Sequence, residues 1–321
     1  MVAQKTLASS RESYGRALLA MAEEYPDIVV LGGDLNVSVF THLWRDKYPE
    51  RFFDFGPAEQ NIIVVAAGLA ASGKIPFVST FAVFGVGRPF DQLRVLVSQP
   101  NLNLKLVCTH AGILTGEDGM SAHSIEDLAL TCSLANFNVV VPADAEEAAQ
   151  ATRVAAETEG PFYIRLPRAA TPVVHDQSHR FILGQSRVMR EGQDLTFIAT
   201  GVMVSVSLDA AELLAQSGVQ ARVVNMATLK PTDEETILAA ARETGAIVTA
   251  EEHYIHGGLG SIVAQVVTRG HPVPMEMVAL QGYSQSGKAE ELMARNGLSP
   301  ENLRAAAETV LRRKKPGKKA G

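Results

Sequence analysis

The sequence FGPAEQN at residues 55–61 places a single carboxylate, that of Glu59, directly before the apolar run IIVVAAGLAA at residues 62–71. A helix that is apolar on all sides is buried, so this stretch predicts a core helix with Glu59 in its first turn. One interpretation is structural, because a carboxylate there complements the helix dipole. The other is functional: with few neutralising neighbours in sequence, a buried carboxyl can hold a proton for a ligand.

Length and composition limit the possible classes of protein. The 321 residues suffice for about two domains, and 46% hydrophobic with 20% charged residues is typical of globular proteins. A net charge of -6 argues against a nucleic-acid partner. Cys108 and Cys132 lie in apolar surroundings and are expected to be buried thiols. Without a bilayer-spanning run or the apolar core of a signal peptide at residues 1–10, we expect a cytoplasmic protein with no membrane partner.

Apolar strands alternate with helices along the first half of the chain. Strands are expected at residues 28–31, 76–79, 104–108, 138–141 and 162–165, with helices at 11–24, 59–71, 89–98, 125–135 and 145–157. This alternation predicts a mostly parallel sheet flanked by helices.

The second half repeats the alternation. Strands are expected at 195–199, 221–225, 246–250 and 275–279, and helices at 202–216, 233–243, 258–267 and from about Ser299. The sequence therefore predicts a two-domain α/β protein, with domains at residues 1–175 and 185–313, a linker at 176–184 and a basic disordered tail at 314–321.

Candidate functional residues gather after the strands of the first domain, where a doubly wound sheet binds ligands. Phe81 and Phe84 could form an aromatic wall or be ordinary core, and His110 could be catalytic or structural. The acids of GEDG at residues 116–119 could bind a ligand or lie in a solvated turn. No dinucleotide-binding or P-loop glycine motif follows a strand.

Five motifs in order resemble one family. They are GGDL at 32–35, DFGPAEQN at 54–61, TFAVF at 80–84, THAGI at 109–113 and GEDG at 116–119. They look like the pyrimidine-binding domain of transketolases, whereas residues 185–313, with EEH at 251–253 and GGLG at 257–260, look like the transketolase C-terminal domain. The resemblance implies a thiamine-diphosphate enzyme that transfers a two-carbon ketol unit from a ketose to an aldose, either of which can be a phosphate.

The resemblance also implies residue roles. Glu59 would hydrogen-bond N1′ of the cofactor's aminopyrimidine, so that the cofactor can lose its C2 proton. Phe81 and Phe84 would stack on the pyrimidine, and Asp34 and Leu35 would contact the cofactor region. Substrate oxygens or phosphate would be held by Arg11, Ser38, His110, Asp118, His123 and Arg168, with His110 also assigned to catalysis.

The family's diphosphate and metal motifs are missing. Neither Gly-Asp-Gly nor Asn-Asn occurs in the chain, so Mg²⁺ or Ca²⁺ is not assigned to residues of this chain. The resemblance is therefore to the second subunit of a split transketolase, inactive without a separate N-terminal subunit that carries the diphosphate site. The expected assembly contains two copies of each chain.

Two departures from the family pattern affect substrate specificity. Ala122 stands where the family has a histidine, with His123 one residue late, and Gly87 stands where an aromatic residue often completes the wall. Alternative activities are those of a 1-deoxyxylulose-5-phosphate synthase or a 2-oxoacid dehydrogenase β-subunit, and the chain could also be a non-catalytic regulatory subunit. Glu251, Glu252, His253 and His256 are expected to serve a structural or interface role rather than bind a metal.

Overall fold

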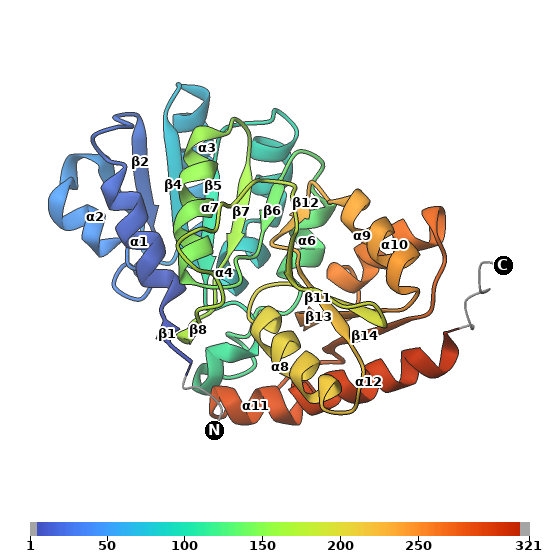
Figure 1. Ribbon diagram of the computed structural model, residues 1–321. Coiled ribbons are helices and arrows are strands. Elements are labelled where there is room, and N and C mark those ends of the chain that lie inside the picture. Colours follow the sequence, from blue (N-terminus) through green and yellow to red (C-terminus); the bar gives the residue numbers. More distant parts are fainter. Residues whose placement is uncertain (1–4, 315–321) are drawn as a thin grey trace.

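A computed structural model describes residues 5–314, which form two α/β units (Figure 1). The sheet of the first unit has seven strands in the order β12-β6-β7-β5-β4-β2-β3, all parallel except β12. The strands are β2 (Ile28–Gly32), β3 (Phe52–Asp54), β4 (Ile75–Phe81), β5 (Lys105–Thr109), β6 (Asn138–Val140), β7 (Phe162–Arg165) and β12 (Thr228–Lys230).

Helices cover both faces of this sheet. Ile28 and Val30 of β2 point to the face covered by α1 (Ser10–Ala20) and α7 (Ala145–Glu157). Val29 and Leu31 point to the opposite face, where α3 (Glu59–Ala71), α4 (Ala82–Gly87) and α6 (Asp127–Ser133) pack. Because both faces are buried, β2 is apolar throughout rather than alternating.

The second unit has a five-stranded sheet in the order β14-β13-β10-β11-β9, with only β9 antiparallel. Its strands are β9 (Arg187–Arg190), β10 (Leu195–Ala199), β11 (Ala221–Asn225), β13 (Ile247–Tyr254) and β14 (Met275–Leu280). Helices α8 (Met203–Ala215) and α12 (Pro300–Arg313) cover one face, and α9 (Glu234–Thr244) and α10 (Leu259–Gly270) cover the other.

Short elements complete the chain. Strands β1 (Leu7–Ala8) and β8 (Thr171–Pro172) pair with each other. The remaining helical segments are α2 (His42–Lys47), η1 (Pro49–Arg51), α5 (Phe90–Gln92), η2 (Leu93–Ser98), η3 (Ile113–Asp118) and α11 (Ala289–Arg295). Within residues 5–314, the helices are too short or too polar for any of them to cross a membrane.

The predicted fold class is confirmed, and the differences are local. The first helix ends at Ala20 rather than at residue 24, because a turn leads into Pro26. Strand β12 was not expected, since a three-residue antiparallel edge strand carries little periodic signal. It joins the sheet of the first unit although it lies in the predicted second domain. Cys132 is only partly buried.

The predicted tail is only partly within the described residues. Lys314 is within them, and its Nζ donates a hydrogen bond to the carbonyl of Asp194 at 2.9 Å. The remaining residues of the predicted tail, 315–321, lie outside the described part of the chain.

Candidate functional site

Glu59 opens helix α3 and is 4% exposed. Contrary to the expectation of a carboxylate with few neutralising neighbours, Arg88 pairs with it: Nη1 lies 2.9 Å from each carboxylate oxygen. The two residues are 29 positions apart, so the pair is not visible in the local sequence. The Arg88 side chain is half exposed and its guanidinium lies 4.1 Å from the centre of the Phe84 ring. Arg88 therefore links the acid to the aromatic residues.

Three rings form a continuous stack beside this pair. The rings of Phe81 and Phe84 are 6.0 Å apart with an interplanar angle of 16°, and those of Phe81 and His110 are 3.6 Å apart with an angle of 18°. Phe81 ends β4, Phe84 lies in α4, and His110 follows β5. The spacing in sequence left open whether the phenylalanines were core or wall; Phe84 is only partly buried, which leaves ring surface for a ligand.

His110 is held as a neutral ring in a strained backbone conformation. Burial, followed by the nearby charges of Arg11 and Arg168, lowers the pKa of His110 to about 3. Its Nδ1 lies 2.8 Å from Oγ1 of Thr109. The φ angles of His110 and Asp34 are 56° and 62°, in the left-handed region. Non-glycine residues in this region cost about 1–3 kcal/mol and cluster at functional sites.

A cationic cavity of about 460 Å³ is lined by Arg11, Glu117, Arg168 and Lys288 among others. The charges of two of these residues, Arg11 and Arg168, act on His110. Arg11 Nη1 donates to the carbonyl of Ser38 at 2.6 Å, which places Ser38 beside it. Burial and the charge of Arg168 lower the pKa of Arg11. Two guanidinium groups close enough to repel favour an anionic ligand between them.

Arg168 also brings Asp118 to this cavity. Its Nη1 donates to the carbonyl of Thr115 at 2.9 Å, and its Nη2 lies 3.9 Å from Oδ1 of Asp118. Lys288, which precedes α11 in the second unit, was not among the sequence candidates. Sequence reasoning missed it because only the fold brings that loop to the first unit.

Other predicted residues lie apart from these contacts. His123 is 2% exposed, and its Nε2 donates to the carbonyl of Gly116 at 3.0 Å, which holds the turn of residues 116–119. Asp34 is exposed, and its amide donates to Oδ1 of Asp54. The carbonyl of Leu35 accepts from the amide of Val39. None of these three residues lines the cavity of Arg11 and Arg168.

The acids of β13 hold backbone amides, in agreement with the structural role expected for them. Glu251 accepts from the amides of Leu259 and Gly260 at the start of α10, at 2.7 and 2.8 Å. Glu252 accepts from the amide of Leu114, in the segment that follows His110, at 2.6 Å. Burial raises the pKa of each of the two acids to about 7. Glu252 thus holds Leu114, which lines the cavity, from the second unit.

Comparisons with known proteins agree with this architecture. Family models for the transketolase pyrimidine-binding domain and the transketolase C-terminal domain match residues 7–173 and 184–303. The chain is 41% identical over 297 residues to a "Putative transketolase C-terminal section" of Methanocaldococcus jannaschii, covering 91% of this chain and 93% of that protein. It is 37% identical to a 6-deoxy-6-sulfo-D-fructose transketolase subunit of a Clostridium species, covering 95% of each.

A solved structure described as "Split gene transketolase, inactive beta4 tetramer" superposes with a TM-score of 0.90 and 45% identity. The match covers 96% of this chain and 99% of that one. The two domains, their order and the match along nearly the whole chain all agree, and the protein therefore belongs to the transketolase family, of which it carries the pyrimidine-binding and C-terminal domains.

Proposed function

We propose that the chain is one subunit of a thiamine-diphosphate-dependent transketolase that moves a two-carbon ketol unit from a ketose to an aldose. The observation that carries the proposal is the buried carboxylate of Glu59 at the start of α3, connected through Arg88 to the ring stack of Phe84, Phe81 and His110. A scaffold subunit has no need of a charged group at a buried helix start beside open aromatic surface.

The residues present fit the pyrimidine half of the cofactor. An aminopyrimidine offers flat faces and ring nitrogens, and the partly buried Phe84 offers a face next to a carboxylate that can take part in a hydrogen bond. When bound, thiamine diphosphate supplies a thiazolium carbon that becomes a nucleophile on losing its proton. Glu59 would hold the proton at N1′, and Asp34 and Leu35 would contact the cofactor from the end of β2.

The cationic cavity would hold the substrate's anionic end. Arg11 and Arg168 would bind a phosphate, with Ser38 beside Arg11 and Asp118 within reach of sugar hydroxyls. His110, kept neutral, can exchange hydrogen bonds with substrate oxygens without adding a charge. His123 would act on this site by positioning the turn at 116–119. The Clostridium relative is named for a sulfonated sugar, which also has an anionic end.

The diphosphate and its Mg²⁺ or Ca²⁺ would be held by a separate chain. This chain contains neither Gly-Asp-Gly nor Asn-Asn, and a close structural neighbour made of β-chains alone is described as an inactive tetramer. We propose an assembly of two copies of each chain, in which this chain self-associates and each active site lies between subunits. Such an obligate interface should be large and apolar.

Calorimetric titration of thiamine diphosphate with Mg²⁺ tests the proposal, first on this chain and then on the chain co-expressed with its partner. We expect binding, and turnover of a ketose phosphate, only in the complex. Pyruvate with an aldose phosphate, or with an artificial electron acceptor, should give no turnover. Activity of the chain alone would overturn the split arrangement, and absence of binding in the complex would overturn the catalytic role.

A further inference from the structure

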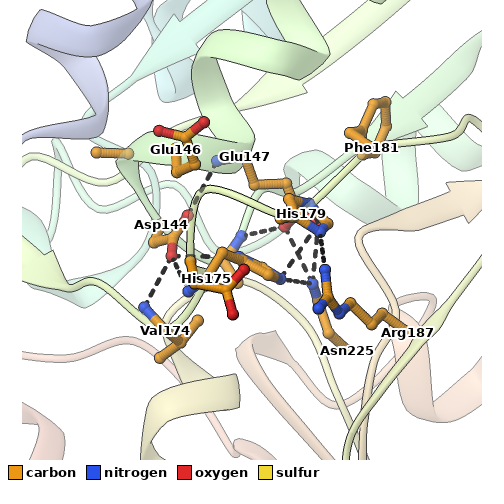
Figure 2. A network of polar contacts seen from close by, with 12 residues as sticks. Asp144, Glu146, Glu147, Val174, His175, His179, Phe181, Arg187 and Asn225 are labelled. Carbon is orange, nitrogen blue, oxygen red and sulfur yellow. Dashed lines mark hydrogen bonds and ion pairs between the residues drawn. The ribbon is translucent and has the colours of Figure 1, made fainter.

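A second cluster of polar side chains lies far from Glu59 in sequence, where three parts of the chain meet (Figure 2). Asp144 caps α7, and Glu147 lies in the first turn of that helix, in the first unit. His175 and His179 lie in the segment that connects the two units, and Asn225 ends β11 in the second unit. All five side chains are buried. The proposed transketolase chemistry uses none of them.

The geometry of the cluster matches a small metal site. Oε1 of Glu147 lies 3.3 Å from Nε2 of His179 and 3.9 Å from Nε2 of His175. The three ligand atoms all lie within 4.8 Å of one another. A tetrahedral ion with ligand bonds of about 2.0–2.2 Å keeps neighbouring ligand atoms about 3.3–3.6 Å apart. Small shifts would therefore bring all three atoms into coordination range.

Asn225 can complete the ligand set. Its amide nitrogen lies 2.9 Å from Oε1 of Glu147 and 3.4 Å from Nε2 of His175, whereas its buried oxygen has no hydrogen-bond partner. A rotation of the amide by about 180° exchanges the two atoms and points the oxygen at the same centre. The second oxygen of Glu147 is already engaged by the amide of Ala143, so Oε1 is the one left for an ion.

Asp144 is placed to orient His175 in the way that carboxylates orient metal-binding imidazoles. Its Oδ2 accepts from the amides of Val174 and His175, each at 2.8 Å. It also lies 3.2 Å from Nδ1 of the His175 ring, which has no hydrogen-bond partner of good geometry. A proton on Nδ1 facing this carboxylate leaves the lone pair of Nε2 directed at Glu147. Nε2 of His179 is also buried and lacks a hydrogen-bond partner of good geometry.

We propose that Glu147, His175, His179 and Asn225 bind one divalent transition-metal ion, with Zn²⁺ the best match, which fastens the connecting segment to both units. Two imidazoles with carboxylate and amide oxygens form a ligand set that suits Zn²⁺. The ion would also offset the charges of the two buried carboxylates, those of Asp144 and Glu147. The role is structural, because the cluster is closed by protein on nearly every side.

The hydrogen bond from Arg187 to His179 competes with binding of the ion. Nη1 of Arg187 lies 2.7 Å from Nδ1 of His179. A guanidinium only donates, so Nδ1 accepts and the neutral ring carries its proton on Nε2, facing Glu147. A metal-bound neutral ring must carry the proton on Nδ1, so binding requires Arg187 to move away. A cavity of about 140 Å³ lined by Glu147, His179, Arg187 and Asn225 gives the guanidinium room to do so.

The test uses the full chain, treated with a chelator and then titrated with ZnCl₂ against a chromophoric chelator, with thermal unfolding as a second readout. We expect one equivalent to bind and to raise the unfolding temperature. Arg187→Gln should bind Zn²⁺ about tenfold or more tightly, because a cationic group that only donates is replaced by a neutral amide whose oxygen can accept from Nδ1 of His179. His179→Gln should lose the equivalent, and His271→Gln, which changes an exposed histidine outside the cluster, should keep it.

Circular dichroism of His179→Gln separates a lost ligand from a lost fold, and Arg187→Gln leaves every ligand in place. Retention of the equivalent by folded His179→Gln would overturn the site. So would an affinity that does not rise in Arg187→Gln, or absence of binding by the unaltered chain. In any of these cases the cluster would be a metal-free network in which Arg187 holds His179.

Discussion

One nitrogen of Arg88, Nη1, lies 2.9 Å from both carboxylate oxygens of Glu59. The guanidinium therefore occupies the hydrogen-bonding edge that the proposed cofactor would need. Arg88 is half exposed and rests on Phe84, so it can leave without disturbing the core. In the free chain, Glu59 is thus paired with Arg88, and the proposed cofactor would have to displace this arginine.

Removing this competitor should strengthen cofactor binding. In the complex with the partner chain, we expect Arg88→Ala to bind thiamine diphosphate about two- to tenfold more tightly, because a charge-assisted contact no longer has to be broken. Calorimetric titration measures the change. Arg94→Ala is the matched control, since Arg94 is exposed and pairs with the exposed Asp91. Weaker binding by Arg88→Ala would mean that Arg88 holds the cofactor instead.

Glu59→Gln should separate activity from stability. We expect the rate of ketol transfer by the complex to fall by about 10²–10⁴, because an amide cannot hold the proton at N1′. The free energy of unfolding should change by about 1 kcal/mol or less, since the lost partner of Glu59 is a half-exposed arginine. Initial rates and urea unfolding give the two values. An active Glu59→Gln complex would refute the assigned role.

Arg11→Ala should discriminate between phosphorylated and unphosphorylated donors. Loss of the guanidinium removes charge-assisted hydrogen bonds worth about 1.5–3 kcal/mol, so we expect KM for a ketose phosphate to rise about 10- to 100-fold. KM for the unphosphorylated ketose should stay nearly constant. Arg16→Ala on the same helix is the control, because Arg16 is exposed and pairs with Glu12. An equal rise for both donors would contradict a phosphate role.

His110 should make the protein less stable in mild acid. Its pKa is about 3 in the folded chain against 6.5 for the free side chain, so below pH 6.5 the unfolded state binds the proton more readily. Stability is then lost as pH falls from 6.5 toward 3, by at most about 1.4 kcal/mol per pH unit. Urea unfolding at about pH 7 and about pH 5 should show a smaller loss for His110→Gln. An imidazole NMR signal that titrates near 6.5 would contradict this.

Gly112→Ala should destabilise the fold next to the site. Gly112 has a φ of 72°, and a Cβ there would lie 2.3 Å from Cδ of Glu252. We expect a loss of about 2–4 kcal/mol in the free energy of unfolding. Gly68→Ala is the opposite control: Gly68 lies inside α3 with no atom near its Cβ position, so a gain of about 0.5–1 kcal/mol is expected. Chemical denaturation measures the free energy of unfolding of both variants. Equal changes would show that Glu252 moves aside to make room for the new Cβ.

The sequence supports the fold well because the signals that set it are local. The apolar runs of β2 and β5 need no partner to be recognised, and Ser9, Asp144, Asp233 and Ser299 each cap a helix as their residue types suggest. The burial of Glu59 likewise follows from the apolar run directly after it.

The parts that could not be predicted depend on distant contacts. Arg88 reaches Glu59, Lys288 reaches the cavity of Arg11, and Glu252 reaches Leu114 only after the chain has folded. His175 and His179 lie in an irregular segment, where a spacing of four residues does not place two side chains on one face. The cluster around Glu147 was therefore not visible in the sequence. The roles of Asp34, Leu35 and the substrate residues remain predictions.

Strand β12 determines whether the first domain can be produced as a separate fragment. Residues 228–230 close the edge of the first sheet by pairing with β6, although they lie in the predicted second domain. A fragment that stops at residue 184 would leave the amides and carbonyls of Val139 and Val140 open to pairing with other chains. Expressed alone, such a fragment should collect in insoluble aggregates, so the two halves must be produced as one polypeptide.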